Sequence, residues 1–385
     1  MSKKTKLGMV GGSLDAFIGE VHRKAAAMDG KFELVCGAFS SSPEKSKKTG
    51  EALSLDSSRV YGSYKEMIEK ESQLPENERM EAVSIVTPNH VHFEPAKLAL
   101  ENGFHVIIDK PITFSLEEAK QLKKIVDSTG NILALTHTYT GYPMVKQARH
   151  MVATGQLGKI RKIYVEYPQG WLSTPLEDEG NKQASWRTDP EKSGAGGAIG
   201  DIGTHAANLA EYVSGLNITQ ISADVNIYVE NRRLDDDSAA LLKFENDASG
   251  VLMATQIAAG EENDLKLRVY GEKGGVKWIH SDPNSLHYKT LDGPYQTLRA
   301  GTGYLADSIA KFTRTPAGHP EGYLEAFANI YLEFHNAVSD FKNGNFSSIE
   351  DYDFPGADDG IRGMAFVDTM LESNKSETKW TPFKK

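Results

Sequence analysis

Short apolar runs alternate with helical patterns through the first third of the chain. Five runs rich in Val, Ile and Leu are separated by segments whose apolar residues recur at helical spacing. These runs cover residues 6–12, 32–39, 82–88, 105–111 and 131–137. Continuous apolar strands between helices are typical of a parallel sheet that is buried on both faces. The pattern therefore predicts a Rossmann-type, doubly wound α/β domain.

From about residue 140 onward, apolar and polar residues alternate along the predicted strands. Residues 248–260 and 264–278 show this alternation, and short turns such as Glu272-Lys273-Gly274-Gly275 join such runs. Alternation is typical of antiparallel strands with one solvated or interface-forming face. The polar stretch 173–193 is interpreted as a loop near a site, and residues 321–372 again have a helical pattern.

Two domains follow from this change of pattern and from the length of 385 residues, which exceeds a typical single core. We predict a dinucleotide-binding domain over residues 1–138. Residues 139–385 are predicted to form an α/β domain with a large, mostly antiparallel sheet, for substrate binding and oligomerisation.

Composition excludes several classes of partner. The net charge of -10 argues against nucleic acid and against an anionic membrane surface. The only cysteine is Cys36, so no disulfide forms within the chain and a reducing compartment is favoured. We see neither a secretory signal nor an apolar run approaching ~20 residues. A cytoplasmic protein with no membrane contact is expected.

The first predicted strand ends in a glycine turn. In dinucleotide folds this turn lets the pyrophosphate approach the backbone, and the next helix N-terminus stabilises the phosphate charge. Here the turn covers residues 11–19, longer than the usual G-x-G-x-x-G spacing. We expect cofactor contacts from Gly11, Gly12, Ser13, Phe17 and Ile18.

The second predicted strand lacks the carboxylate that commonly binds the adenine ribose at this position. Ser40 and Ser41 stand there instead, with Lys45 nearby. These side chains suit either ribose hydroxyls or a 2′-phosphate. The cofactor is therefore expected to be NAD or NADP, and the choice between them stays open.

Three motifs follow one another along the chain: Thr87-Pro88-Asn89-His90-Val91-His92, Asp109-Lys110-Pro111, and Gly196–His205. In this order they resemble the Gfo/Idh/MocA oxidoreductase family, and the resemblance covers essentially the whole chain. The family's usual Glu-Lys-Pro motif has Asp109 in place of the glutamate in this chain. The glycine turn departs further from the family pattern. The chain is similar to the inositol and sugar dehydrogenase group of this family.

The resemblance implies reversible oxidation of a secondary hydroxyl of a cyclic polyol or sugar (inositol, aldose, glycoside or anhydrosugar) by NAD(P). It also implies that Lys110, Asp201 and His205 form the catalytic group. The small-molecule substrate is expected to be the main partner besides the cofactor. The open face of the second sheet is expected to make a homodimer or homotetramer.

The spacing of the third motif fits this role. Asp201 and His205 fall one turn apart on a predicted helix, beside an apolar stripe that begins at Ile202. Asp201 is expected to orient His205 or to bind a substrate hydroxyl. The glycines before it are expected to clear space for the substrate ring.

Further candidates extend the expected site. Thr87, Asn89 and His92 are expected to line the nicotinamide side, and Arg187 to bind cofactor or substrate. The full cofactor set adds Pro88, Asp109 and Lys110. The expected substrate contacts are Lys110, His137, Tyr139, Gln169, Trp171, Asp201 and His205. No metal is expected, because Cys36 stands alone and a zinc dehydrogenase would need thiolate ligands.

Two alternative functions come from other classes. An NAD-dependent glycosidase of related fold would hydrolyse a glycoside without net reduction of the cofactor. A non-enzymatic dinucleotide-binding sensor would be expected to have lost catalytic residues, yet Lys110, Asp201 and His205 are all present.

Overall fold

The computed structural model describes residues 4–384 and divides the chain into two compact units. The first comprises Met1–Thr138 and Tyr323–Ile361, and the second comprises Tyr139–Gly322 and Arg362–Lys385. These compact units differ from the predicted domain ranges 1–138 and 139–385 in that residues 323–361 cluster with the first unit. The predicted domains and their roles stay a prediction.

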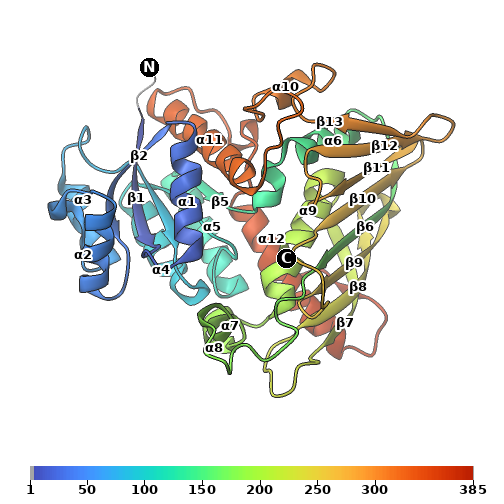
Figure 1. The fold of residues 1–385 in the computed structure, drawn as a ribbon, viewed down its shortest axis with the longest axis horizontal. Helices are drawn as coiled ribbons and strands as arrows, with labels where there is room; N and C mark the ends of the chain where they lie inside the picture. Colours follow the sequence, from blue (N-terminus) through green and yellow to red (C-terminus); the bar gives the residue numbers. More distant parts are fainter. Residues whose placement is uncertain (1–3, 385) are drawn as a thin grey trace. The chain divides into compact units, whose positions relative to one another are not determined.

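The first unit contains a parallel sheet of the predicted Rossmann type (Figure 1). Its strands are β1 (Thr5–Gly11), β2 (Phe32–Ala38), β3 (Ala82–Val86), β4 (His105–Ile108) and β5 (Leu133–Leu135). The strand order is β2-β1-β3-β4-β5, with all neighbours parallel. Consecutive apolar side chains are buried on both faces of such strands, which explains the continuous apolar runs.

Helices cover both faces of this sheet. They are α1 (Phe17–Met28), α2 (Pro43–Ala52), α3 (Tyr64–Gln73), α4 (Phe93–Glu101), α5 (Leu116–Thr129) and α11 (Tyr323–Lys342). Ser42, Ser63 and Ser115 cap α2, α3 and α5 through their side-chain oxygens. These caps satisfy backbone N–H groups that the helices themselves leave unpaired.

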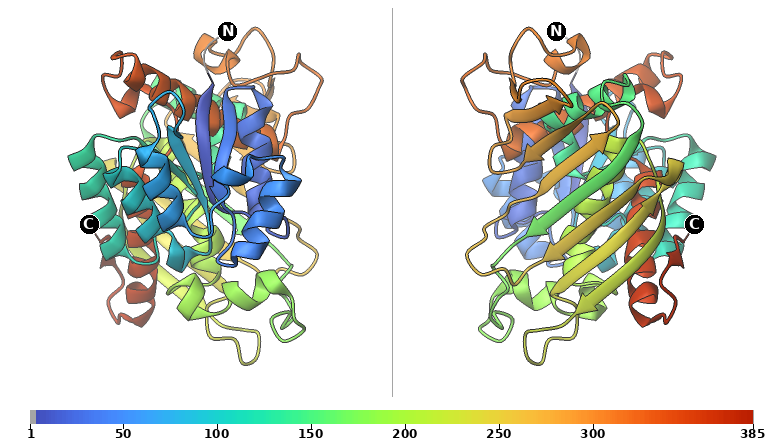
Figure 2. Two further views of the ribbon diagram at one scale, coloured as in Figure 1. Left: turned by 90° about the vertical axis from the view of Figure 1, so that its left-hand side faces the viewer. Right: turned by 90° about the vertical axis from the view of Figure 1, so that its right-hand side faces the viewer.

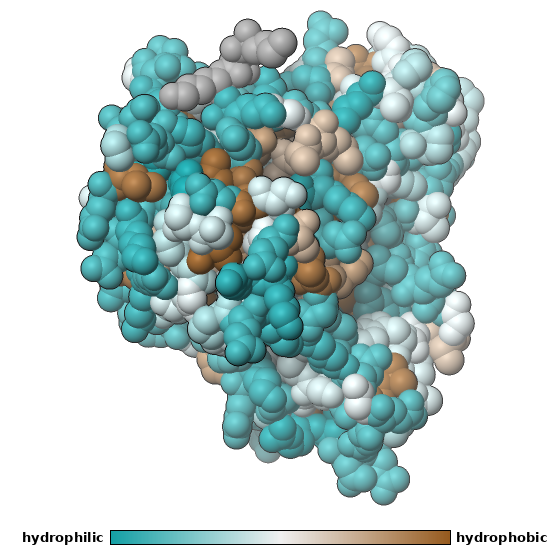
Figure 3. All heavy atoms as spheres, turned by 60° about the vertical axis from the view of Figure 1, so that its left-hand side comes forward, coloured by the Kyte–Doolittle hydropathy of each residue, from teal (hydrophilic) through white to brown (hydrophobic). Residues whose placement is uncertain are grey.

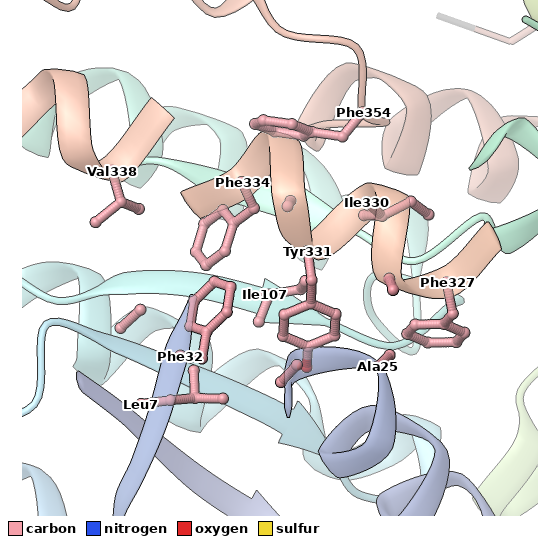
Figure 4. Close-up of a cluster of buried hydrophobic side chains, with 14 of the residues drawn as sticks. Leu7, Ala25, Phe32, Ile107, Phe327, Ile330, Tyr331, Phe334, Val338 and Phe354 are labelled. Carbon is pink, nitrogen blue, oxygen red and sulfur yellow. The ribbon is translucent and has the colours of Figure 1, made fainter. Parts of the chain in front are cut away.

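Helix α11 belongs to the first unit because its apolar side chains pack against the parallel sheet. Phe327, Tyr331 and Phe334 pack against Phe32 and the neighbouring strands (Figure 4). The Tyr331 hydroxyl also lies 2.8 Å from His22 Nδ1, inside the core. Helical periodicity reveals that this segment has an apolar face, but it does not reveal which sheet that face covers.

The second unit contains a nine-stranded sheet that is mostly antiparallel, as predicted. Its strands are β6 (Ile160–Pro168), β7 (Ile218–Asn226), β8 (Asp237–Phe244), β9 (Ser249–Thr255), β10 (Lys266–Gly271), β11 (Gly274–Ile279), β12 (Ser285–Thr290), β13 (Gln296–Arg299) and β14 (Thr381–Pro382). Their order is β13-β12-β11-β10-β6-β9-β8-β7-β14. The pair β6 and β9 is parallel, and this exception matters for the site.

One face of this sheet packs against helices of its own unit. The helices of the unit are α6 (Pro143–Ala153), α7 (Lys182–Arg187), α8 (Pro190–Ser193), α9 (Thr204–Ser214), α10 (Asp307–Ala310) and the part of α12 (Ala357–Lys375) that follows Ile361. In the right-hand view of Figure 2, the strands of this unit lie in front, and among the described residues none of the unit's own helices covers the near face. The predicted loop 173–193 contains the short helices α7 and α8.

The surface seen in Figure 3 is largely hydrophilic, with separate hydrophobic patches. Within residues 4–384, we find no helix whose length and apolarity would let it span a bilayer.

Candidate active site

A tight glycine turn joins β1 to α1 in the first unit. Gly11 and Gly12 have φ angles of +83° and +74°, which L side chains rarely adopt. A Cβ atom on Gly19 would lie 2.3 Å from Cα of Gly12, so the helix approaches the turn only because both residues are glycine. Within the described residues, no side chain caps the N-terminus of α1. The turn therefore fits a pyrophosphate held by backbone N–H groups.

The turn after β2 lies beside the glycine turn, because β1 and β2 are neighbouring parallel strands. Ser40 Oγ accepts a hydrogen bond from the N–H of Ser42 at 3.1 Å, whereas Ser41 and Lys45 are exposed. Lys45 Nζ lies 3.7 Å from Oδ2 of Asp15, a residue of the glycine turn. A carboxylate is thus present near the predicted ribose position, although none ends β2.

A buried histidine ties together the turns that follow β3 and β4. His92 Nδ1 lies 2.7 Å from Pro111 O, and its Nε2 lies 2.9 Å from Thr87 O. Burial lowers the pKa of His92, although the Asp109 charge and the two carbonyl groups favour the protonated ring. The buried ring fixes the backbone around the site through these two contacts. Contact of His92 with the cofactor stays a prediction.

Other predicted cofactor residues follow β3 at the same edge of the sheet. Thr87 Oγ1 donates a hydrogen bond to Val91 O at 3.2 Å. Asn89, which comes after Pro88, is buried in the 3-10 turn Asn89–Val91. Their binding of the cofactor stays a prediction.

Lys110 follows β4 at the carboxyl edge of the parallel sheet, where ligands collect in open α/β folds. Asp109 Oδ1 accepts hydrogen bonds from the Lys110 N–H and from Thr136 Oγ1, both at 2.9 Å. The Lys110–Pro111 peptide bond is cis. The backbone that carries the lysine is therefore fixed by its acidic neighbour.

His137 lies buried in the same unit and is influenced by the charge of Lys110. Burial, and then this positive charge, lowers the pKa of His137 to about 3. Its ring is consequently neutral at physiological pH. Substrate contact by His137 stays a prediction, but protonation of this ring does not occur in the neutral range.

In the second unit, Asp201 and His205 lie where a π-helical turn, η4 (Ile199–Gly203), runs into α9. Asp201 Oδ2 accepts a hydrogen bond from Gln256 Nε2 at 2.9 Å and lies 3.4 Å from Arg187 Nε. The His205 ring meets the Tyr139 ring edge to face, with centroids 5.0 Å apart. π-helical turns are frequent at functional sites. Arg187, a predicted cofactor contact, therefore belongs to the surroundings of Asp201.

A chain of amide side chains extends away from Asp201. Gln256 Nε2 also lies 3.1 Å from Gln169 Oε1, which accepts a second hydrogen bond from Trp171 Nε1 at 3.0 Å. The predicted residues Gln169 and Trp171 are thus connected to Asp201 through Gln256. The sequence pattern did not single out Gln256.

Asn263 connects these amides to the aromatic side chains around His205. Its Oδ1 accepts hydrogen bonds from Gln169 Nε2 at 2.6 Å and from the Tyr167 hydroxyl at 2.7 Å. Its Nδ2 donates to the Tyr139 hydroxyl at 3.2 Å. Burial raises the pKa of Tyr139, so this phenol stays protonated at neutral pH. Asn263 and Tyr167 were not predicted from the sequence.

The parallel strand pair explains why these residues meet. In β6 and β9, Pro168 pairs with Thr255, so Gln169 and Gln256 leave the sheet side by side. Strand β10 begins at Lys266 opposite the end of β6, which brings the preceding loop to the same edge. The polar groups therefore collect where several strand ends coincide.

A buried carboxylate holds the segment that precedes Asp201. Asp235 Oδ1 and Oδ2 accept hydrogen bonds from the N–H groups of Gly197 at 2.6 Å and Ile199 at 2.8 Å. The Asp235 carbonyl accepts a third from Ala198 at 2.9 Å. Burial raises the pKa of Asp235 to about 6, even though the N–H groups favour its ionised form. These three donors are engaged by the protein itself and not kept for an anionic ligand.

The glycines of this segment also need a revised interpretation. A Cβ on Gly197 would lie 2.0 Å from Asp235 O, and one on Gly196 would lie 2.6 Å from Ile199 Cγ1. Neighbouring protein atoms thus occupy the space that these glycines leave. The expectation that the glycines clear room for a substrate ring is wrong for Gly196 and Gly197, while Gly200 has open space beside it.

The parallel sheet and its glycine turn are typical of a domain that binds a dinucleotide. Residues 5–137 match the oxidoreductase family with an NAD-binding Rossmann fold, and residues 145–277 match the Gfo/Idh/MocA C-terminal domain. The chain belongs to the Gfo/Idh/MocA family, which confirms the resemblance seen in its motifs. It is a dehydrogenase of the class acting on CH–OH groups.

Individual relatives cover all or nearly all of the chain. The uncharacterized oxidoreductase YfiI of Bacillus subtilis is 33% identical over 390 residues, 100% of this chain and 98% of the relative. An oxidoreductase structure from Sinorhizobium meliloti is 44% identical with a TM-score of 0.88, covering 99% of this chain and 100% of that one. An inositol dehydrogenase homolog from Azotobacter vinelandii, complexed with NADH and myo-inositol, is 32% identical with a TM-score of 0.92, covering 100% and 98%.

Proposed function

We propose that this protein reversibly oxidises a secondary hydroxyl of a neutral cyclic polyol or sugar to the ketone, with a nicotinamide cofactor. The observation that carries the proposal is the amide and aromatic cluster beside Asp201 and His205. Gln169, Gln256 and Asn263 hydrogen-bond to one another there, and Gln256 also holds the Asp201 carboxylate, which can accept a hydrogen bond from a ligand hydroxyl. The relative that binds myo-inositol with NADH supports the same substrate class.

Three side chains of this chain carry the proposed chemistry. In the oxidative direction His205 accepts the hydroxyl proton, and Lys110 holds the reacting oxygen and stabilises its developing charge. Asp201 binds a neighbouring hydroxyl or orients the histidine. Bound nicotinamide supplies the hydride acceptor.

Purified protein should be screened with NAD and NADP against inositols, aldoses, glycosides and anhydrosugars, with reduced nicotinamide as the readout. Formation of one reduced cofactor per ketone from a free polyol or sugar is expected. Release of free sugar from a glycoside with no net reduced cofactor would identify the hydrolytic alternative. Cofactor binding without turnover of any compound would favour the sensor.

Cofactor choice is tested by Ser40→Asp. The new carboxylate would stand at the proposed ribose position, where it repels a 2′-phosphate but still accepts hydrogen bonds from ribose hydroxyls. We expect NADPH to bind at least about 10-fold more weakly, with a smaller effect on NADH. Fluorescence titration of both reduced cofactors measures this, with Ser72→Asp on α3 as a control. Equal NADPH affinity in Ser40→Asp would remove Ser40 from the ribose pocket.

We further propose that the uncovered face of the second sheet forms a homodimer or homotetramer. Leu241, Met253 and Tyr270 are 45%, 47% and 41% exposed on strands β8, β9 and β10. Exposed apolar side chains gathered on one face mark interaction surfaces. We expect Leu241→Lys combined with Met253→Lys to lower the mass measured by light scattering. Ile349→Lys, at an exposed apolar residue of the first unit, should leave the mass unchanged, and an unchanged double variant would contradict the proposal.

A further inference from the structure

Gly200 differs from the other glycines around Asp201 in what surrounds it. A Cβ on Gly197 would collide with Asp235 O at 2.0 Å, and one on Gly203 would lie 3.3 Å from Phe366 Cε1. Among the described residues, a Cβ on Gly200 would meet no atom within 4 Å outside its own helical turn and its two chain neighbours. The packing of the protein therefore explains the first two glycines but not Gly200.

Backbone conformation does not explain Gly200 either. It lies within the π-helical turn Ile199–Gly203, and its φ is outside the left-handed range. In helical backbone, glycine is less stable than alanine because it loses more conformational freedom on folding. The folded protein without ligand should therefore prefer alanine at this position.

The surroundings of Gly200 indicate the chemistry of a ligand. Asp201 follows directly, with its side chain 18% exposed, and Arg187 lies 3.4 Å from that carboxylate with its side chain 25% exposed. The two opposite charges balance each other, so this part of the site favours a neutral, hydroxyl-rich ligand over an anionic one. Because the Asp235 contacts hold the preceding backbone, the surface at Gly200 is formed before a ligand binds.

We infer that Gly200 is a specificity-determining residue, whose missing side chain lets the ring of a neutral cyclic polyol or sugar lie directly against the helix backbone beside Asp201. This inference rests on the proposed function. A methyl group at residue 200 would occupy the space of the ring. The same substitution would cause no collision in the protein without substrate.

Gly200→Ala tests this by predicting effects of opposite sign on stability and on substrate binding. The unfolding temperature without ligands should rise by about 1–3 °C. The KM for the best polyol or sugar in the screen should rise by about 10- to 100-fold, because overpacking is costly in a preformed site. The Kd for NADH, measured by fluorescence, should stay unchanged.

Gly197→Ala is the matched control. The Cβ added at residue 197 would collide with a backbone oxygen, so the unfolding temperature of this variant should fall. A lower unfolding temperature in Gly200→Ala would show that the fold itself requires this glycine, and would overturn the inference. Weaker NADH binding by Gly200→Ala would mean that the nicotinamide occupies the space beside Gly200. An unchanged KM would mean that solvent occupies it, and either result contradicts the inference. If the wild-type protein oxidises no polyol or sugar, the proposed function fails and the inference fails with it. An active wild type with an unaffected Gly200→Ala variant contradicts the inference alone.

Discussion

Lys110→Met should lower turnover by about 10²–10⁴-fold, the range expected for a positioned proton-transfer or charge-stabilising group. Methionine keeps an unbranched chain but removes the ammonium that we propose holds the reacting oxygen. The backbone around residue 110 is anchored through Asp109 and Thr136, so the substitution should not disturb the strand end. Steady-state turnover in both directions measures the effect, and NADH titration should show that the cofactor still binds.

Lys24→Met is a matched control in the same unit. Lys24 lies on α1 with its side chain 56% exposed, and it pairs with Glu20 one helical turn away. Surface pairs of this kind contribute little, so turnover and stability should stay close to wild type. Near-normal turnover in Lys110→Met would mean that Lys110 is a solvated cation at a strand end and takes no part in the reaction.

The sequence predicts the sheet of the first unit well, because each of its buried strands is a continuous run of apolar residues. The runs around Val83, Ile107 and Leu133 are apolar on both faces, and few other structures require that pattern. The membership of α11 could not be predicted in the same way. Its apolar face is visible in the sequence, but the surface that it covers is set by tertiary contacts with Phe32 and its neighbours.

The candidate site is predicted only in part, for a related reason. Asp201 and His205 are visible because their spacing is local to one helix. Gln256 and Asn263 join them only because β6 and β9 pair in parallel within an antiparallel sheet. A short alternating strand does not reveal its partner or its direction, so these residues carried no signal that local spacing could detect.

The packing around a residue can also differ from what its residue type suggests. His92 looks like a ligand in a polar motif, yet its ring is enclosed and both nitrogens face backbone carbonyls. Gly197 looks like room for a substrate, yet Asp235 fills that space. Asp235 lies far along the chain from Gly197, and Pro111 lies outside the motif that contains His92, so local patterns do not reveal these contacts.

His205→Asn should abolish most of the turnover and also the rise of the oxidation rate with pH. A histidine must be neutral to accept the hydroxyl proton, so the wild-type rate should increase as the ring loses its proton. Asparagine keeps hydrogen-bonding capacity but cannot act as a base in this range. We expect a loss of about 10²–10⁴-fold, measured as kcat and kcat/KM across pH.

Three buried histidines should not produce a rise in rate near neutrality. Burial lowers the pKa of His137 to about 3, and that of His22 and His105 to about 4, so these rings stay neutral in the folded protein. Between about pH 4 and pH 6.5 they take up protons only when the chain unfolds. Their contribution to stability is therefore present above about pH 6.5 and is lost as the pH falls toward about 4. Profiles should accordingly be recorded above about pH 6, with unfolding monitored in parallel.

The pH at which the oxidation rate rises distinguishes the proposed role of Asp201 from that of His205. A nearby carboxylate favours the protonated imidazole, so Asp201→Asn should shift the rise to lower pH and also weaken substrate binding. His137→Gln should leave the rise in place, since that ring is neutral throughout. If His205→Asn retained wild-type turnover with an intact rise, the base would be another group. Asp201 and His205 would then be a polar helix face with no part in the chemistry, however closely the surrounding amides pack against them.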